Sequence, residues 1–173
     1  MNEVRLIDAI LTVRFESVSA KAEEFEREYS RLGEEEEDAI GQWMRVAKAK
    51  GETSESDPVV LHLLVELYRK MDRLENLILH SAPERRPLAQ TGEIGRIGFE
   101  HFELDAPLLN PGERYYGRIE LPVHPRRETP LYFEAVSPVL ARITRIHPRD
   151  ESEWGAYMMA RERIMIRHLK GHE

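Results

Sequence analysis

The sequence predicts an α+β protein in which a small antiparallel β-barrel is combined with a long two-helix heptad coiled coil and a C-terminal helix. Two observations predict this fold class. Between residues 18 and 78, apolar side chains recur at alternating steps of four and three residues, which is the spacing of a coiled-coil seam. After residue 93, apolar and polar side chains instead alternate in short runs separated by turn residues, as expected of antiparallel strands.

The order of these patterns divides the chain into three segments. Residues 1–16 contain a lead-in and the first barrel strand, because residues 10–15 (Ile-Leu-Thr-Val-Arg-Phe) are rich in β-formers. Residues 17–81 form the coiled-coil oligomerisation region, and residues 82–173 form the rest of the barrel with the last helix. The barrel is therefore expected to be split in sequence, with residues 10–15 pairing beside strands that follow residue 93. Leu6, Ile7 and Ile10 also fit a helical stripe, so the alternative places residues 10–15 in the first turns of the long helix.

The first helical stripe consists of apolar residues at heptad spacing, namely Val18, Ala22, Phe25, Tyr29, Leu32, Ala39, Trp43 and Val46. Gly33 and Gly41 weaken this helix, and we expect a kink near Gly33. The acidic run over residues 21–38 is interpreted as the solvated face of the helix.

The second helix is predicted to start at Asp57-Pro58, because an aspartate caps a helix and proline suits its first position. Its heptad stripe is the predicted oligomer interface: Val60, Leu64, Leu67, Met71, Leu74 and Ile78. A second apolar stripe runs beside it: Leu61, Val65 and Tyr68. An apolar surface this wide must be buried on more than one side. We therefore predict an intramolecular hairpin of the two helices together with self-association, with a tetramer preferred over a dimer. A hairpin alone is the alternative.

Short alternating runs predict strands over residues 94–104, 115–121, 131–137 and 139–146, with a turn at Asn110-Pro-Gly-Glu. A final helix is expected to be capped by Asp150 and to pack an apolar face on the barrel, formed by Trp154, Tyr157, Met158, Ile164 and Met165.

Composition excludes several classes of function. The chain has no cysteine, so it has neither disulfides nor thiolate chemistry, and its net charge of −7 disfavours nucleic acid as a partner. No apolar run is long enough to span a membrane, and a cytoplasmic location is expected. Only His168 and His172 have the spacing of helical metal ligands, and we interpret them as surface histidines. Because no nucleophile stands beside a basic partner, we expect no enzymatic activity and no metal.

The segments at residues 93–102 (Glu-Ile-Gly-Arg-Ile-Gly-Phe-Glu-His-Phe), 118–122 and 131–136, followed by a C-terminal helix, resemble a PilZ domain. The arrangement of a leading strand, paired heptad helices and a last helix with the arginine-rich residues 161–167 is similar to the atypical tetrameric branch of that family. The resemblance implies a small barrel, assembly through the helices, and a role in bacterial signalling of the cyclic di-GMP type.

In that family, an Asp/Asn-x-Ser-x-x-Gly motif and an Arg-x-x-x-Arg motif bind cyclic di-GMP. The resemblance places Glu93, Gly95 and Gly98 at the first motif, and Arg5 with Ala9 at the second. A glycine offers no hydroxyl, and a glutamate brings negative charge toward an anionic ligand. Substitute ligands would be the nearby arginines Arg5, Arg96, Arg126 and Arg127. The loop that carries the last two, residues 124–130, is more simply interpreted as a solvated patch for docking a protein.

These observations favour a non-enzymatic regulatory adaptor that oligomerises through its coiled coil, takes no cofactor, and presents its barrel to another signalling or motility protein. The sequence does not identify that partner. A direct cyclic di-GMP receptor with non-standard arginine ligands and a purely structural coiled-coil scaffold are the two alternatives.

Overall fold

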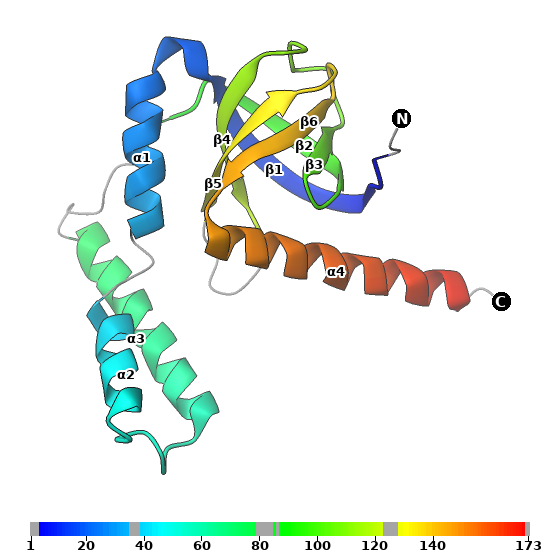
Figure 1. The fold of residues 1–173 in the computed structure, drawn as a ribbon. Helices are drawn as coiled ribbons and strands as arrows, with labels where there is room; N and C mark the ends of the chain where they lie inside the picture. The colour runs from blue at the N-terminus through cyan, green and yellow to red at the C-terminus, as the bar shows by residue number, and fades with distance from the viewer. Residues whose placement is uncertain (1–3, 35–38, 79–84, 86, 123–127, 172–173) are drawn as a thin grey trace. The chain divides into compact units, whose positions relative to one another are not determined.

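The computed structural model describes residues 4–34, 39–78, 85, 87–122 and 128–171 (Figure 1). The chain divides into two compact units. Residues 1–29 together with residues 87–173 make up the first, which we call the barrel unit. Residues 30–86 make up the second, which we call the helical unit.

The barrel unit is built on six strands that close into an antiparallel barrel in the order β1-β2-β3-β6-β5-β4. The strands are β1 (Ile7–Ser17), β2 (Gln90–Ile97), β3 (His101–Leu104), β4 (Arg114–Glu120), β5 (Glu128–Ala135) and β6 (Leu140–Ile146). Because the sheet closes on itself, each of these strands has a hydrogen-bonded neighbour on both sides. The predicted small antiparallel barrel is therefore present.

Strand β1 joins the N-terminal segment to the rest of the barrel, as the sequence predicts. It pairs with β2 along one edge and with β4 along the other. Buried and exposed side chains alternate from Ile7 to Phe15, so one face of the strand lines the core and the other faces outward. Residues 10–15 thus lie in a strand and not in the first turns of a helix.

The core is filled by apolar side chains that point inward from all six strands. Four aromatic rings form its centre: Phe15 lies 5.5 Å from Tyr115 and 5.9 Å from Phe133, and Phe102 lies 5.0 Å from Phe133. Edge-to-face packing at such distances adds to the stabilisation that comes from burial alone.

One predicted strand, over residues 94–104, is in fact two strands that form the β2–β3 hairpin. The turn begins at Gly98, whose N–H donates to the carbonyl of His101 at 2.7 Å. A Cβ atom at Gly98 would lie only 2.7 Å from the backbone oxygen of Arg5. The close approach of these two backbones therefore requires glycine, and the strand reverses there although no proline marks the turn.

This close approach makes Gly98→Ala a test of the barrel geometry. Because the conflicting atom belongs to the backbone, we expect the substitution to destabilise the chain by about 1–3 kcal/mol. The matched control is Gly155→Ala, because nothing lies within 4 Å of a Cβ at that helical position. The control should be neutral or more stable by about 0.5–1 kcal/mol. Urea unfolding monitored by circular dichroism measures both, and equal midpoints for the two variants would contradict the prediction.

The predicted turn at Asn110-Pro-Gly-Glu is present. The N–H of Glu113 donates to the carbonyl of Asn110 at 3.0 Å, and Gly112 has a φ of 83°. Proline followed by a residue with positive φ is the arrangement of a type II turn, so glycine is required at its third position.

Helix α4 (Pro148–Lys170) follows β6 and packs along the barrel (Figure 1). It starts two residues before the predicted cap, with proline in its first turn, so Asp150 is a buried residue within the helix and not its cap. Trp154 and Met158 belong to the barrel core, and Trp154 Nε1 donates to the carbonyl of Gly98 at 2.9 Å. Ile164, predicted to share this face, is instead exposed.

A short 3₁₀ turn, Val18–Ala20, leads from β1 into helix α1 (Ala22–Glu34). Three members of the first stripe, Phe25, Tyr29 and Leu32, are buried on α1, whereas Trp43 and Val46 of the same stripe are exposed on α2. The partner on α1 is the barrel, because Phe25 and Tyr29 pack against Tyr116 and Tyr132. The helix ends at Glu34, next to the glycine where a kink was expected.

The helical unit contains α2 (Ala39–Ala49) and α3 (Pro58–Ile78), which contact each other as a hairpin. Asp57 caps α3 as predicted, because its Oδ1 accepts a hydrogen bond from the N–H of Val59 at 2.9 Å. The turn between the two helices includes Gly51, which has a φ of 75°.

Candidate functional site

The first candidate site is a face of α3, and its position follows from how α3 packs on α2. Val65 of α3 and Ala47 of α2 are buried in the hairpin, and Leu61 is half-buried. Leu61 and Val65 belong to the second predicted stripe, so α2 covers most of that stripe within one chain. Tyr68, its third member, remains 51% exposed.

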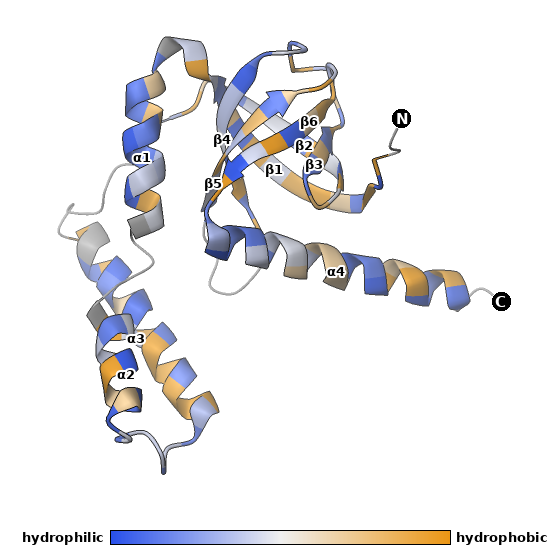
Figure 2. Ribbon diagram, viewed as in Figure 1, coloured by the Kyte–Doolittle hydropathy of each residue, from blue (hydrophilic) through white to orange (hydrophobic). Residues whose placement is uncertain are grey.

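Helix α3 also carries the predicted interface stripe, and all six of its members are exposed. Figure 2 shows hydrophobic residues along the length of this helix. The exposed fraction runs from 50% at Val60 to 76% at Ile78. Since residues spaced by three and four lie on one side of a helix, these six form a continuous apolar face. We call the set Val60, Leu64, Leu67, Met71, Leu74 and Ile78 the α3 face.

The apolar surface is wider than the α3 face alone. Leu63, 61% exposed, and Tyr68 lie at the heptad positions that flank the seam. Burying one large aliphatic side chain is worth about 1.5–3 kcal/mol, so an apolar surface of this size strongly favours a partner. Contiguous exposed apolar surface of this kind is typical of protein or membrane interaction sites.

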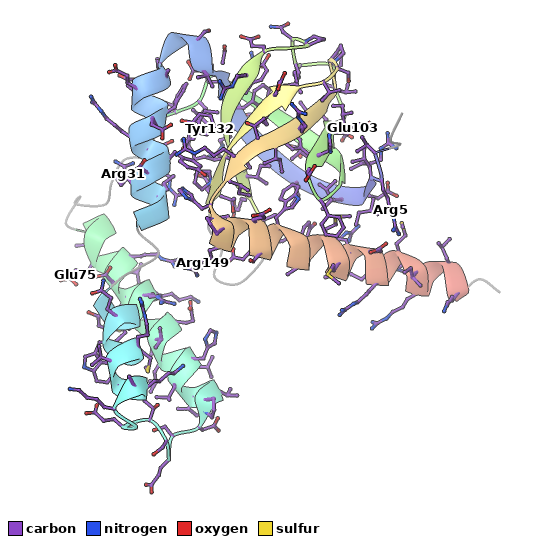
Figure 3. The ribbon with its side chains drawn as sticks, viewed as in Figure 1. Arg5, Arg31, Glu75, Glu103, Tyr132 and Arg149 are labelled. Atoms are coloured by element: carbon purple, nitrogen blue, oxygen red, sulfur yellow. The ribbon has the colours of Figure 1, made fainter. Side chains whose placement is uncertain are left out.

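The second candidate site is the set of residues that the PilZ resemblance places at a ligand. Arg5 precedes β1, and its guanidinium pairs with Glu162 of α4 (Figure 3). Arg96 of β2 pairs with Glu103 of β3, with its Nε at 2.9 Å from Oε1. The hydrogen bond to Glu103 raises the pKa of Arg96 above its ordinary value. Each of these two arginines is thus already paired with a carboxylate of the same chain.

The remaining motif residues of β2 lie among acidic groups. Glu93 accepts hydrogen bonds from the Thr12 hydroxyl at 3.1 and 3.2 Å. At Gly95, a Cβ atom would lie 2.0 Å from Oδ1 of Asp105, so a carboxylate stands where a serine side chain would be. Gly98 serves the hairpin turn described above.

The structure therefore brings Glu93, Gly95 and Arg96 together on one strand, but the carboxylates of Glu93, Asp105 and Glu103 around them disfavour a phosphate. Arg126 and Arg127, together with most of the predicted docking loop, lie outside the described residues.

Sequence reasoning missed a third group of residues, which lies between α1 and the outer side of β4, β5 and β6. Arg118 of β4 is buried there and pairs with Glu28 of α1 and with Glu128 of β5. Arg145 of β6 pairs with Glu26 of α1. No motif signals this cluster, because its members are separated by up to 119 residues along the chain.

Burial changes the acidity of the tyrosines in this third group. Burial raises the pKa of Tyr29 to about 12. The pKa values of Tyr116 and Tyr132 are also raised, mainly by burial and further by the neighbouring carboxylates of Glu28 and Glu26, respectively. These hydroxyls therefore keep their protons at neutral pH.

Two further expectations concern metals and membranes. The described part of the chain contains no cluster of three or more histidine, aspartate or glutamate side chains that could hold a metal ion. His168 is exposed near the end of α4, and His172 lies outside the described residues. Of the helices described, none combines the length and the apolar character needed to cross a bilayer.

The fold and these sites define a small antiparallel barrel with an attached helical hairpin. Comparison with protein-family models, with curated proteins and with solved structures found no match for this chain.

Proposed function

We propose that this protein is a non-enzymatic regulatory adaptor that self-associates through its α3 helices and uses its barrel to contact a signalling or motility protein. The observation that carries the proposal is the α3 face, whose six members are all at least half exposed on the side of α3 away from α2. A long helix with one apolar side covered and the other uncovered favours a partner of the same kind, because a second α3 supplies a matching stripe.

The charges beside the α3 face favour a parallel arrangement of the α3 helices. Lys70 and Glu75 occupy the two positions that flank the seam, and a parallel coiled coil brings such residues together when they are five apart. Lys70 of one copy would then face Glu75 of the second copy. In the antiparallel register that pairs all six seam residues, Lys70 would instead face Lys70 of the second copy, which is repulsive.

A tetramer is proposed in preference to a dimer, because Leu63 and Tyr68 broaden the apolar surface beyond the two seam positions. A two-stranded coiled coil would leave much of these two flanking side chains exposed. Light scattering on the full chain tests the assembly, and a monomer at micromolar concentration would contradict it.

The assignment to cyclic di-GMP-type signalling rests on the PilZ resemblance, and the closed six-stranded barrel is consistent with it. The adaptor is preferred over a direct receptor because both described candidate arginines are paired with carboxylates and because Asp105 occupies the space beside Gly95.

We therefore predict no measurable binding of cyclic di-GMP in the micromolar range. Charge-assisted hydrogen bonds are worth about 1.5–3 kcal/mol each, so losing two or three of them weakens a micromolar site to millimolar or worse. Calorimetric titration of the wild-type chain measures this directly. Saturable heat at micromolar ligand that is abolished in Arg126→Ala or Arg127→Ala would favour the receptor instead.

A further inference from the structure

The outer side of β4, β5 and β6 carries a group of arginines and tyrosines beneath the first turns of α1, all within the barrel unit. Because side chains alternate along a strand, Tyr116 and Arg118 of β4 both point outward and not into the core. The ring of Phe25 stacks on Tyr116 at 5.0 Å, and the ring of Tyr29 lies 5.2 Å from that of Tyr132. These four aromatic rings lie between two arginines of the barrel. We call the surroundings of Arg118 the inner position and those of Arg145 the outer position.

The inner position is occupied by Glu28 of α1. Arg118 Nη1 lies 2.9 and 3.1 Å from the two oxygens of this carboxylate. Glu28 is 4% exposed and Arg118 is 3% exposed, so water is excluded from the pair. Arg118 Nε also donates to Glu128 of the neighbouring strand β5 at 3.1 Å, which fixes the orientation of the guanidinium.

The outer position is occupied by Glu26, on the same helix. Arg145 Nη1 lies 2.8 Å from both oxygens of its carboxylate, and the Tyr132 hydroxyl donates to one of them at 3.2 Å. The Arg145 guanidinium also lies 4.4 Å above the ring of Tyr29. About half of each charged side chain in this pair remains exposed, so the outer position is accessible to solutes.

Glu28 and Glu26 therefore each contact one arginine of the barrel, and each has a tyrosine hydroxyl nearby. Tyr132 uses its hydroxyl on Glu26. The Tyr116 hydroxyl is buried beside Glu28, and this carboxylate adds to the effect of burial in raising the pKa of Tyr116. Each position therefore combines a guanidinium with a protonated tyrosine hydroxyl, which can donate a hydrogen bond to an anion.

A planar guanidinium binds carboxylate and phosphate with the same two-donor geometry. A phosphate also has a third oxygen available, which could accept the hydrogen bond from the tyrosine hydroxyl. We propose that the β4–β6 face beneath α1 is an anion-binding site for a phosphate-bearing ligand, and that Glu26 and Glu28 are its internal occupants, which such a ligand must displace.

The test uses the full chain with Glu26→Gln and Glu28→Gln, which keep the shape of both side chains and remove their charges. Inorganic phosphate is the probe, titrated by calorimetry at an ionic strength held constant with chloride. We expect the double variant to bind phosphate at least tenfold more tightly than the wild type, and Arg118→Gln or Arg145→Gln added to it should remove the gain. Equal affinity in the double variant and the wild type would overturn the proposal.

Two further measurements keep the test decisive if the double variant folds poorly. Glu26→Gln alone changes a half-exposed pair and should by itself raise phosphate affinity severalfold. The matched control is Glu134→Gln, which discharges the exposed pair with Arg142 on the same barrel. An increase in Glu134→Gln equal to that in Glu26→Gln would show an unspecific charge effect and would also overturn the proposal. In the wild type, phosphate should speed hydrogen exchange of the α1 amides more than chloride does.

Discussion

The Leu67→Asp variant is expected to be a monomer at micromolar concentrations at which the wild-type chain is an oligomer. Leu67 lies at the middle of the α3 face, so in the assembly it would be surrounded by apolar side chains of other copies. A carboxylate placed there would lose its hydration without gaining a partner, a cost of several kcal/mol per subunit. Light scattering coupled to size-exclusion chromatography measures the change directly.

The fold of the single chain should survive this substitution, because Leu67 is exposed and α2 packs on the other side of α3. Circular dichroism should therefore show a helix content close to that of the wild type. The matched control is His62→Asp, which introduces the same side chain on the same helix at an exposed position outside the heptad seam. If both variants dissociate, or if neither does, then the α3 face is not the interface.

Much of the barrel could be predicted from the sequence because alternation reports directly on which side chains face a core. The residues from Ile7 to Phe15 illustrate this, since every second side chain is buried in the structure. The end of β2 could not be predicted in the same way. Apolar residues continue past Gly98, but the chain reverses there through the hydrogen bond from Gly98 to His101, at a glycine that the close backbone of Arg5 requires.

The heptad pattern correctly predicted which sides of the helices are apolar, but a helical period does not identify what covers them. Phe25 and Tyr29 have the spacing of a coiled-coil seam, and they pack on tyrosines of the barrel. On α3, Leu61 and Val65 meet α2, whereas the α3 face is exposed in the single chain. The same period thus describes side chains in different surroundings: some are covered by the barrel, some by α2, and those of the α3 face are exposed, as are Trp43 and Val46 of α2.

The ion-pair partners of the candidate ligand residues could not be predicted from the sequence either. The resemblance placed Arg5 and Arg96 near a ligand, but it carried no information on their counterions. In the structure, Glu162 and Glu103 supply these, and the first lies 157 residues away in sequence. Arg118 presents the opposite case. An outward-facing arginine in a strand is normally solvated, and it is buried here because α1 crosses over it.

Replacing Glu28 with alanine is expected to destabilise the barrel unit by about 3 kcal/mol. The substitution removes a carboxylate whose two oxygens both contact Arg118, and it leaves a buried guanidinium that keeps Glu128 as a partner. Removing one partner of a buried ion pair typically costs about 3–5 kcal/mol, and the remaining carboxylate places the expected value at the lower end. Urea unfolding measures the loss, with all variants compared in the Leu67→Asp background so that assembly does not contribute.

The control for Glu28→Ala is Glu134→Ala, which removes one partner of the exposed pair with Arg142 and should cost no more than about 1 kcal/mol. A double variant distinguishes the stability lost through the unpaired charge from the stability lost through poorer packing. If the penalty arises from the uncompensated charge of Arg118, then Glu28→Leu combined with Arg118→Met should recover most of the lost stability, because a well-packed apolar pair avoids the desolvation of both ions. A double variant as unstable as Glu28→Ala would instead show that α1 is held by the shape of this contact and not by its charges.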